Sequence, residues 1–325
     1  MRVAEMLPAA RKVVCKLLAV KPGEEVVVIA DSDTDTAMVY AIVGTLKDVG
    51  AEYSLAFIPN RAGIRNHDLT KFVDQGLEAA DVVIGITTAS PAGAYAKRIA
   101  QLKNAGRLRS MSMVLRDYED WTGGAASADY DGIRDRGNRL GEIWARGKEL
   151  RLTSPAGTEF HARIEGEKLE PNLGFATQAG EAAAFPDGEQ SQMPTEGTAQ
   201  GVIVIDGPLF RFGIPQRPLV FHVEEGRVRS IDGTGNVAER IRRLLATHRN
   251  ADNVAEIGVG LNDGAEFNGR FEEEKKALGT VHVALGDNIS YGGTVACTLH
   301  MDMVLYNPTL RIDSRVVLEG GKLTI

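Results

Sequence analysis

The sequence of 325 residues has very little cysteine, no long apolar run and no excess of positive charge. Its two cysteines, Cys15 and Cys297, lie far apart, which excludes a disulfide scaffold and a cysteine-rich zinc ribbon. No apolar run approaches the roughly 20 residues that a membrane-spanning helix needs, and the N-terminal segment has no signal-peptide core. The formal net charge of −7 argues against a general nucleic-acid-binding protein. We therefore expect a cytoplasmic protein whose partners include neither membrane nor nucleic acid.

The composition is that of a folded protein with more than one domain. Hydrophobic residues make up 43% of the chain and charged residues 25%, close to the average of globular proteins. At roughly 150 residues per domain, the length predicts about two domains. We place the boundary where the character of the sequence changes and predict domains of residues 1–148 and 149–325.

The first domain alternates short apolar runs with segments of helical periodicity. Glu25–Ala30, Glu52–Ile58 and Val82–Thr87 are typical of buried strands. Between the first two, Asp31 and its neighbours can begin a helix that reaches about Val49. Strands that alternate with helices predict an α/β domain with a doubly wound parallel sheet.

The pattern changes after a polar helix predicted over Tyr130–Lys148, which could bridge the two halves. Glu149–Ser154 and Thr158–Ile164 are separated by a Pro-Ala-Gly turn and predict a hairpin. More strand-like runs follow, with one clear helix over Val237–Thr247. The second domain is therefore predicted to be a β-rich α+β domain.

The segment Leu299-His-Met-Asp-Met-Val304 carries the most specific chemical pattern. Side chains alternate between the two faces of a strand, so His300 and Asp302 point to the same face. An imidazole beside a carboxylate supplies two ligands for a divalent metal. Taken alone, the pair is better explained by a simple His–Asp hydrogen bond on a half-buried strand.

Three further residues strengthen the metal interpretation. His282 and Glu256 each lie within an apolar run, where an unpaired polar group is costly. Glu189 follows a Pro-Asp-Gly turn. Individually, Glu189 could be a solvated loop residue and Glu256 a charge at a strand edge. Together with His300 and Asp302, they favour a metal site.

Five ligands are too many for one tetrahedral zinc ion with an open position. They suit two divalent ions about 3.5–4 Å apart that share a bridging carboxylate and activate a water molecule. The predicted ligands are Glu189, Glu256, His282, His300 and Asp302.

At these residues the sequence resembles the M29 metallo-aminopeptidases of the aminopeptidase T and S type. The resemblance is carried, in order along the chain, by FPDGEQSQMPTEGTAQGVIVID, VAEIGVGLN, LGTVHVALGDN and LHMDMVL. It implies that the same five residues bind two metal ions such as Zn, Co, Mn or Mg. It also implies a homodimer, and a catalytic tyrosine for which Tyr291 is the nearest candidate, at a different spacing. Glu256 would bridge the ions or act as the base.

A related branch, the 2,5-dihydroxypyridine dioxygenases, resembles the same C-terminal region. Members hold one Fe(II) with two histidines and one carboxylate, and His300 and Asp302 match two of these ligands. The third, a histidine, falls on Glu256, while Glu189 and His282 lack counterparts. The chain also departs from the aminopeptidases, because it is shorter and its segment between His282 and His300 is trimmed.

The first hypothesis is accordingly a two-metal hydrolase that cleaves an N-terminal peptide bond or a related small amide. Its substrate would be a small molecule or a short peptide. The alternative is a non-haem Fe(II) dioxygenase that opens the ring of a hydroxylated pyridine-like compound. A second alternative is a non-catalytic protein that binds a small ligand and holds a structural ion.

Overall fold

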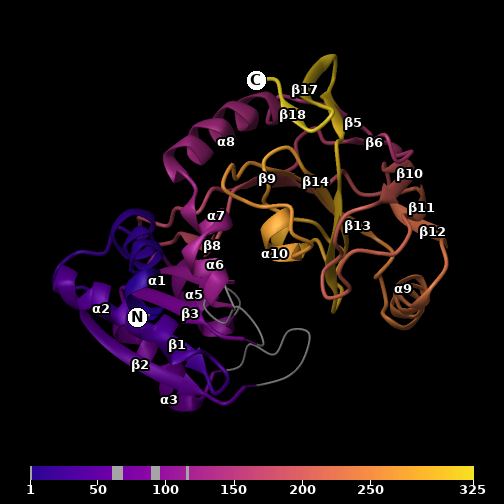
Figure 1. Ribbon diagram of the computed structural model, residues 1–325. Coiled ribbons are helices and arrows are strands. Elements are labelled where there is room, and N and C mark those ends of the chain that lie inside the picture. The colour runs from indigo at the N-terminus through magenta and orange to yellow at the C-terminus, as the bar shows by residue number, and fades with distance from the viewer. Residues whose placement is uncertain (1, 61–68, 89–95, 115–116) are drawn as a thin grey trace. The chain divides into compact units, whose positions relative to one another are not determined.

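The computed structural model describes residues 2–60, 69–88, 96–114 and 117–325, which divide into two compact units (Figure 1). The first unit comprises Met1–Ser127 and Gly174–Asp187, and the second comprises Ala128–Leu173 and Gly188–Ile325. The division differs from the single boundary predicted at residue 148. The chain returns to the first unit at Gly174 because a short strand there completes its sheet.

The helix predicted to bridge the halves, α8 (Tyr130–Trp144), belongs to the second unit. No helix in the described part of the chain is both long and apolar enough to cross a membrane.

A parallel sheet forms the centre of the first unit, as the sequence predicts. Its strand order is β2-β1-β3-β4-β8 among the described residues, and every neighbouring pair is parallel. β3 is buried along its whole length, which explains its lack of polar alternation, and β4 is equally buried although serine and methionine alternate along it. The strands are β1 (Glu25–Asp31), β2 (Glu52–Ile58), β3 (Val82–Ile86), β4 (Arg109–Met113) and β8 (Ala182–Phe185).

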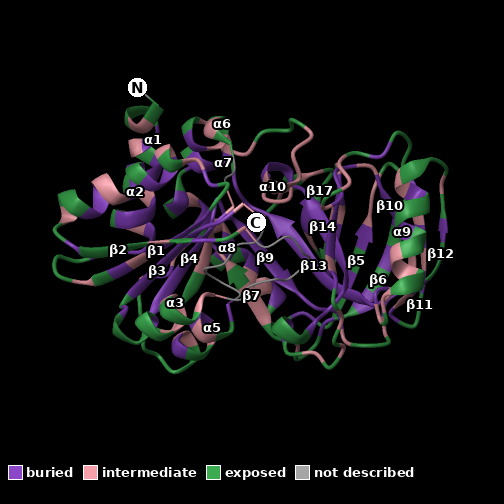
Figure 2. Ribbon diagram, turned by 90° about the horizontal axis from the view of Figure 1, so that it is seen from below, coloured by how far each residue is buried: buried purple, intermediate pink, exposed green. Residues whose placement is uncertain are grey.

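Helices cover both faces of this sheet, with α1 and α2 on one side and α3 and α5 on the other (Figure 2). This doubly wound arrangement confirms the predicted fold class. The first helix begins as α1 and continues as a π-helix, η1. The helices are α1 (Arg2–Arg11), η1 (Lys12–Leu17), α2 (Thr36–Val49), α3 (Lys71–Gly76), the 3₁₀ turn η2 (Leu77–Ala79), α5 (Lys97–Asn104), α6 (Tyr118–Thr122) and α7 (Gly124–Ser127).

A buried ion pair ties the start of β4 to the turn before β1. Nη2 of Arg109 lies 2.7 Å from Oε2 of Glu24, and Nε of Arg109 donates to the Leu18 carbonyl at 2.8 Å. Burial would raise the pKa of Glu24, but Arg109 and the Lys21 amide outweigh it and lower that pKa. The side chain of Arg109 is only 6% exposed and that of Glu24 20%, so loss of Arg109 leaves a partly buried carboxylate without its cation.

We predict that Arg109→Ala lowers the free energy of unfolding by about 3 kcal/mol, because Glu24 is left without its cation. Urea unfolding measures the change. Arg151→Ala is the control, since it removes an equivalent but exposed pair with Glu159 and should cost less than about 1 kcal/mol. Equal losses in the two variants would contradict the prediction.

The second unit contains two sheets whose paired strands are antiparallel. In the first, the described strands are arranged β12-β11-β10-β6-β5-β16-β17-β18. It includes the predicted hairpin, in which β5 pairs with β6. The strands are β5 (Glu149–Thr153), β6 (Glu159–Arg163), β10 (Gln200–Ile205), β11 (Leu219–Glu224), β12 (Arg227–Asp232), β16 (Thr309–Ile312), β17 (Arg315–Glu319) and β18 (Lys322–Leu323), and α9 (Asn236–Thr247) follows β12.

The other sheet carries the residues of chemical interest, in the order β15-β14-β13-β9-β7. Every residue of β13, β14 and β9 is buried, and α8 contacts β7 and β9. The strands are β7 (Leu169–Asn172), β9 (Glu189–Gln192), β13 (Val254–Gly260), β14 (Val281–Gly286) and β15 (His300–Leu305), with the short helices α10 (Phe271–Glu274) and η3 (Ile289–Tyr291) nearby in the sequence. The polar sequences of β7 and β9 gave no strand signal.

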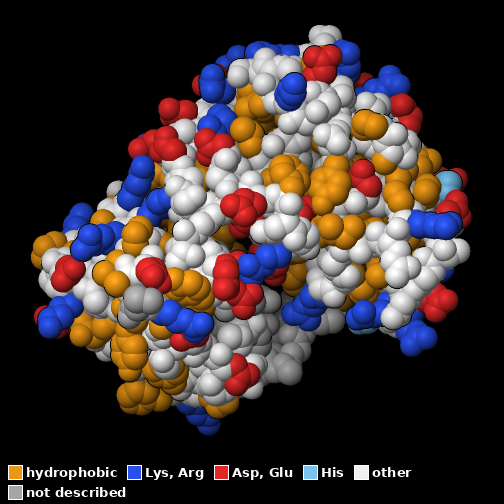
Figure 3. Space-filling view, viewed as in Figure 1, with side chains coloured by type: hydrophobic (Ala, Val, Ile, Leu, Met, Phe, Trp, Pro, Cys, Tyr) orange, Lys and Arg blue, Asp and Glu red, His pale blue; other side chains and the backbone are white. Residues whose placement is uncertain are grey.

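The surface is charged with both signs. Basic and acidic side chains are interspersed on the face drawn in Figure 3, and its described residues show no extended area of one charge. This agrees with the small excess of 44 acidic over 37 basic residues in the chain.

Candidate metal centre

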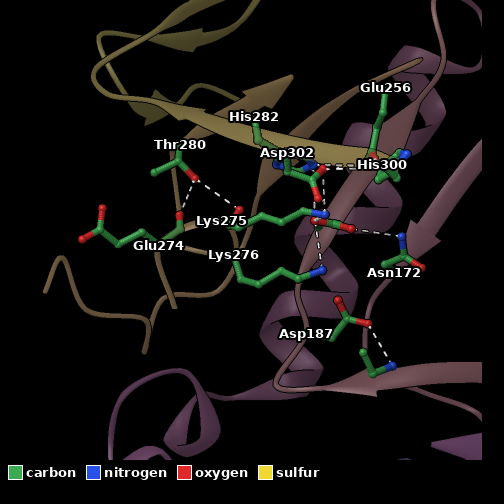
Figure 4. A network of polar contacts seen from close by, with 12 residues as sticks. Asn172, Asp187, Glu256, Glu274, Lys275, Lys276, Thr280, His282, His300 and Asp302 are labelled. Atoms are coloured by element: carbon green, nitrogen blue, oxygen red, sulfur yellow. Dashed lines mark hydrogen bonds and ion pairs between the residues drawn. The ribbon is translucent and has the colours of Figure 1, made fainter. Parts of the chain in front are cut away.

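All five predicted ligands lie on one face of the five-stranded sheet of the second unit. β15 places His300 and Asp302 on the same face by simple alternation, as the sequence predicts. The strand registers align the remaining three from β9, β13 and β14 (Figure 4). The cross-strand pairs are Glu189 with Gly260, Gly258 with His282, Ala284 with Glu256 and Ala284 with Asp302.

Glu256, His300 and Asp302 form one group of potential ligands. Nε2 of His300 lies 2.8 Å from Oε2 of Glu256 and 3.7 Å from Oδ1 of Asp302. One ligand atom from each of the three lies within 4.8 Å of the others. A single divalent ion bound to all three would therefore need little rearrangement of the strands.

Glu189, Glu256 and His282 form a second group, in which one ligand atom from each residue also lies within 4.8 Å of the others. Nε2 of His282 lies 3.1 Å from Oε1 of Glu256 and 3.5 Å from Oε2 of Glu189. The two groups share Glu256, whose oxygens each face a different histidine. This carboxylate is fully buried, so it depends on these cationic or metal partners to remain ionised.

The ring of His300 is oriented by the backbone. Its Nδ1 lies 2.8 Å from the Asp287 carbonyl oxygen, and only an N–H can bond there. Nε2 therefore faces the two carboxylates, where its lone pair is available to a metal once its proton leaves. Such a bond from the distal ring nitrogen is the usual support of a metal-binding histidine.

The carboxylates hold His300 in its protonated form when no metal is bound. Burial by itself would lower the pKa of His300, but Asp302 and Glu256 outweigh burial and raise that pKa well above its usual value. Burial would likewise raise the pKa of Asp302, but Lys275 and His300 lower it to about 2.

Two lysines that the sequence analysis did not identify complete the site. Nζ of Lys275 lies 3.2 Å from Oδ1 of Asp302, and Nζ of Lys276 lies 2.9 Å from Oε2 of Glu189. Both come from the segment Phe-Glu-Glu-Glu-Lys-Lys, which resembles a solvated helix surface in sequence. Only their burial beside carboxylates distinguishes them, and no sequence pattern reports that.

Tyr291 lies beside the first group, as its predicted catalytic role requires. Its ring stacks on His300 with centroids 6.0 Å apart, and it is 8% exposed. Burial and the Glu256 charge raise the pKa of Tyr291 well above its usual value, so the phenol keeps its proton at neutral pH. A protonated phenol can donate a hydrogen bond to a bound oxygen, but its catalytic role remains a prediction.

The ligand types suit a divalent transition metal. Each group supplies one imidazole and two carboxylates, and the two groups share Glu256. Asp302 Oδ1 and Glu189 Oε2 are buried and face lysine ammonium groups at 3.2 and 2.9 Å. Such oxygens fit a site that holds an ion, and nitrogen–oxygen sets of this kind suit Fe(II), Mn or Zn.

A glycine makes room for one of the histidines. A Cβ atom on Gly258 would lie 2.2 Å from both Cε1 and Nε2 of His282, which is far inside contact distance. The pair faces each other across β13 and β14, so any side chain at this position would push the ring aside. The glycine in the Glu256-Ile-Gly motif thus has a steric reason.

We predict that Gly258→Ala displaces the ring of His282 from Glu256 and lowers the free energy of unfolding by about 1–3 kcal/mol. Urea unfolding measures the loss. The control, Gly44→Ala, lies in α2 with open space around its Cβ and should be neutral or stabilising. A folded Gly258→Ala variant with the same free energy of unfolding as the wild type would contradict this steric role.

We also predict that metal affinity falls as the pH is lowered. Because the pKa of His300 is raised, a metal must displace its proton, and each displaced proton weakens apparent binding about tenfold per pH unit. Titration calorimetry in buffers of different ionisation enthalpy counts the released protons. Affinity that is constant between about pH 6 and 8 would show that His300 does not bind the metal.

Comparison with known proteins links this chain to one enzyme family. The sequence model of the 2,5-dihydroxypyridine 5,6-dioxygenase family matches residues 6–325. A 2,5-dihydroxypyridine 5,6-dioxygenase of Pseudomonas putida is 25% identical over 189 residues, in a match that covers 54% of this chain. That alignment spans only about half of the relative, 53% of its length.

Two solved structures share the fold over the whole chain. The 2,5-dihydroxypyridine dioxygenase of Pseudomonas putida superposes with a TM-score of 0.85 at 20% identity, covering 99% of this chain and 97% of that one. AmpT of Thermus thermophilus superposes with a TM-score of 0.71 at 15% identity, covering 99% of both chains. The predicted M29-type fold is therefore confirmed, whereas the family match is to the dioxygenases.

Proposed function

The chain belongs to the 2,5-dihydroxypyridine 5,6-dioxygenase family, and from this premise we propose that it is a metal-dependent dioxygenase of a hydroxylated pyridine-like compound. The family match over residues 6–325 is the observation that carries the proposal. It supports the oxygenase, which the sequence analysis held as the alternative, over the aminopeptidase-type hydrolase. It also disfavours a non-catalytic binding protein.

Glu256, His300 and Asp302 would hold the ion in this reaction. Bound there, Fe(II) would supply the means to activate dioxygen, both of whose atoms enter the substrate as a ring carbon–carbon bond breaks. Among the side chains, Tyr291 keeps a proton beside His300 and can donate it in a hydrogen bond to a substrate oxygen. The Asp287 carbonyl fixes the ring of His300.

A two-metal hydrolase is the second candidate, because one observation favours it. Glu189, Glu256 and His282 form an additional group that shares Glu256 with the first. Two ions bridged by a carboxylate are a usual arrangement for hydrolysis by a metal-activated water. The dioxygenase resemblance leaves Glu189 and His282 without counterparts, so their proximity requires a separate explanation.

We predict oxygen uptake by the Fe(II)-loaded protein when 2,5-dihydroxypyridine is added, measured with an oxygen electrode alongside the loss of ring absorbance. His300→Ala should reduce the rate by more than about a hundredfold, because a ligand is removed. His161→Ala, at an exposed position of β6, should leave the rate unchanged.

Two results separate the candidates. No oxygen uptake from a series of hydroxylated pyridines by the iron-loaded protein would contradict the dioxygenase. Release of nitroaniline from aminoacyl nitroanilides by Zn-, Co- or Mn-loaded protein would instead support the hydrolase, provided that His300→Ala abolishes it.

A further inference from the structure

Lys275 and Lys276 bring two buried ammonium groups to the candidate metal centre. The two residues follow α10 directly, and their side chains reach the carboxylates of β9 and β15 (Figure 4). Their side chains are only 13% and 11% exposed. Lysine is rarely buried without a specific partner, so these positions need an explanation beyond surface charge.

The ammonium groups contact the oxygens that also face the histidines. Oε2 of Glu189 lies 2.9 Å from Nζ of Lys276 and 3.5 Å from Nε2 of His282. Nζ of Lys275 lies 3.6 Å from the same oxygen. The lysines therefore meet Glu189 at the position where a second metal ion would bind it.

Asp302 contacts fewer lysine ammonium groups than Glu189 does. Its Oδ1 lies 3.2 Å from Nζ of Lys275, and Nε2 of His300 lies 3.7 Å from the same oxygen. Glu189 thus faces two ammonium groups, whereas Asp302 faces one. The group with Glu256, His300 and Asp302 remains the better place for an ion.

Charge balance leads to the same assignment. The three carboxylates of the site carry three negative charges, and the two lysines offset two of them. One divalent ion then leaves a net charge of +1, which one anionic oxygen of a substrate can neutralise. Two divalent ions would leave +3 among side chains that are almost entirely buried, and charge that is not balanced is costly there.

We propose that Lys275 and Lys276 take the place of a second metal ion and bind an anionic oxygen of the substrate. The site would then hold one divalent ion on Glu256, His300 and Asp302. The ligand class is an aromatic compound with an ionised ring hydroxyl or a carboxylate. The choice of an aromatic ring rests on the proposed function, whereas the replacement of an ion by two lysines does not.

Metal stoichiometry tests the first part of the proposal, that the two lysines take the place of a second metal ion. We expect one equivalent of Zn or Fe(II) in the wild type, measured by mass spectrometry after stripping and reloading. Lys275→Met/Lys276→Met keeps the side-chain volume but removes both charges, and should bind two equivalents. Its metal-free form should melt at a lower temperature than the wild type, with the loss reversed by metal.

The matched control for stoichiometry is Lys148→Met, which removes a lysine from an exposed ion pair with Glu165 and should still bind one equivalent. Two equivalents in the wild type would overturn the proposal. So would a folded double variant that still binds one equivalent with unchanged affinity.

A coloured phenol tests the second part of the proposal, that the two lysines bind an anionic oxygen of the substrate. In the Zn-loaded wild type, 4-nitrophenol should bind as its anion, which is visible as a gain of the phenolate absorption band below the pKa of the free phenol. Each single lysine-to-methionine variant should bind the anion at least about tenfold more weakly, because a charge-assisted contact is lost. Equal phenolate binding in the variants and in Lys148→Met would overturn the anion-binding role.

Failure of the lysine role and failure of the proposed dioxygenase function give different results. One equivalent of metal with lysine-dependent phenolate binding, but no oxygen uptake, would retain this inference and reject the dioxygenase. Oxygen uptake with the same KM in wild type and lysine variants would retain the dioxygenase and reject the lysine role.

Discussion

Glu189, Glu256 and Asp302 carry three negative charges into a region where solvent reaches almost none of their surface. Isolated carboxylates in such surroundings would take up protons, because burial favours the neutral form. Here the neighbouring cations outweigh burial, and the pKa values of all three are lowered. The histidines and lysines offset this negative charge, and a bound metal ion would offset it further. Without such cations, the buried carboxylates would destabilise the fold, and with them this face of the sheet is suited to bind a metal.

The five-stranded sheet of the second unit meets that constraint through its geometry. Alternation in β15 sends His300 and Asp302 to one face, and the register brings Glu256 and His282 beside them. Gly258 leaves the space that the His282 ring occupies. β13 and β14 are fully buried, so their ligand positions are held by the backbone hydrogen bonds of the sheet and depend little on loops.

The same fold occurs in a 2,5-dihydroxypyridine dioxygenase and in AmpT, and a fold alone does not identify a reaction. The family match favours the dioxygenase. The side chains do not all fit a dioxygenase, because Glu256 stands where that resemblance implies a histidine. His282 and Glu189 also form a second group with Glu256. Lys275 and Lys276 account for the second group, since their two ammonium groups satisfy Glu189 without a second ion.

The sequence by itself determined the α/β character of the first unit, the β-rich second unit and the identity of five clustered ligand-type residues. These features follow from local rules, namely hydrophobic period, turn residues and strand alternation, together with family resemblance. Tertiary structure alone decided that Gly174–Asp187 returns to the first unit and that the polar strand β9 is buried. It also decided that Lys275 and Lys276 face carboxylates, because pairing between distant segments sets burial and charge environment, and a local pattern such as Glu-Glu-Glu-Lys-Lys is the same on a solvated surface.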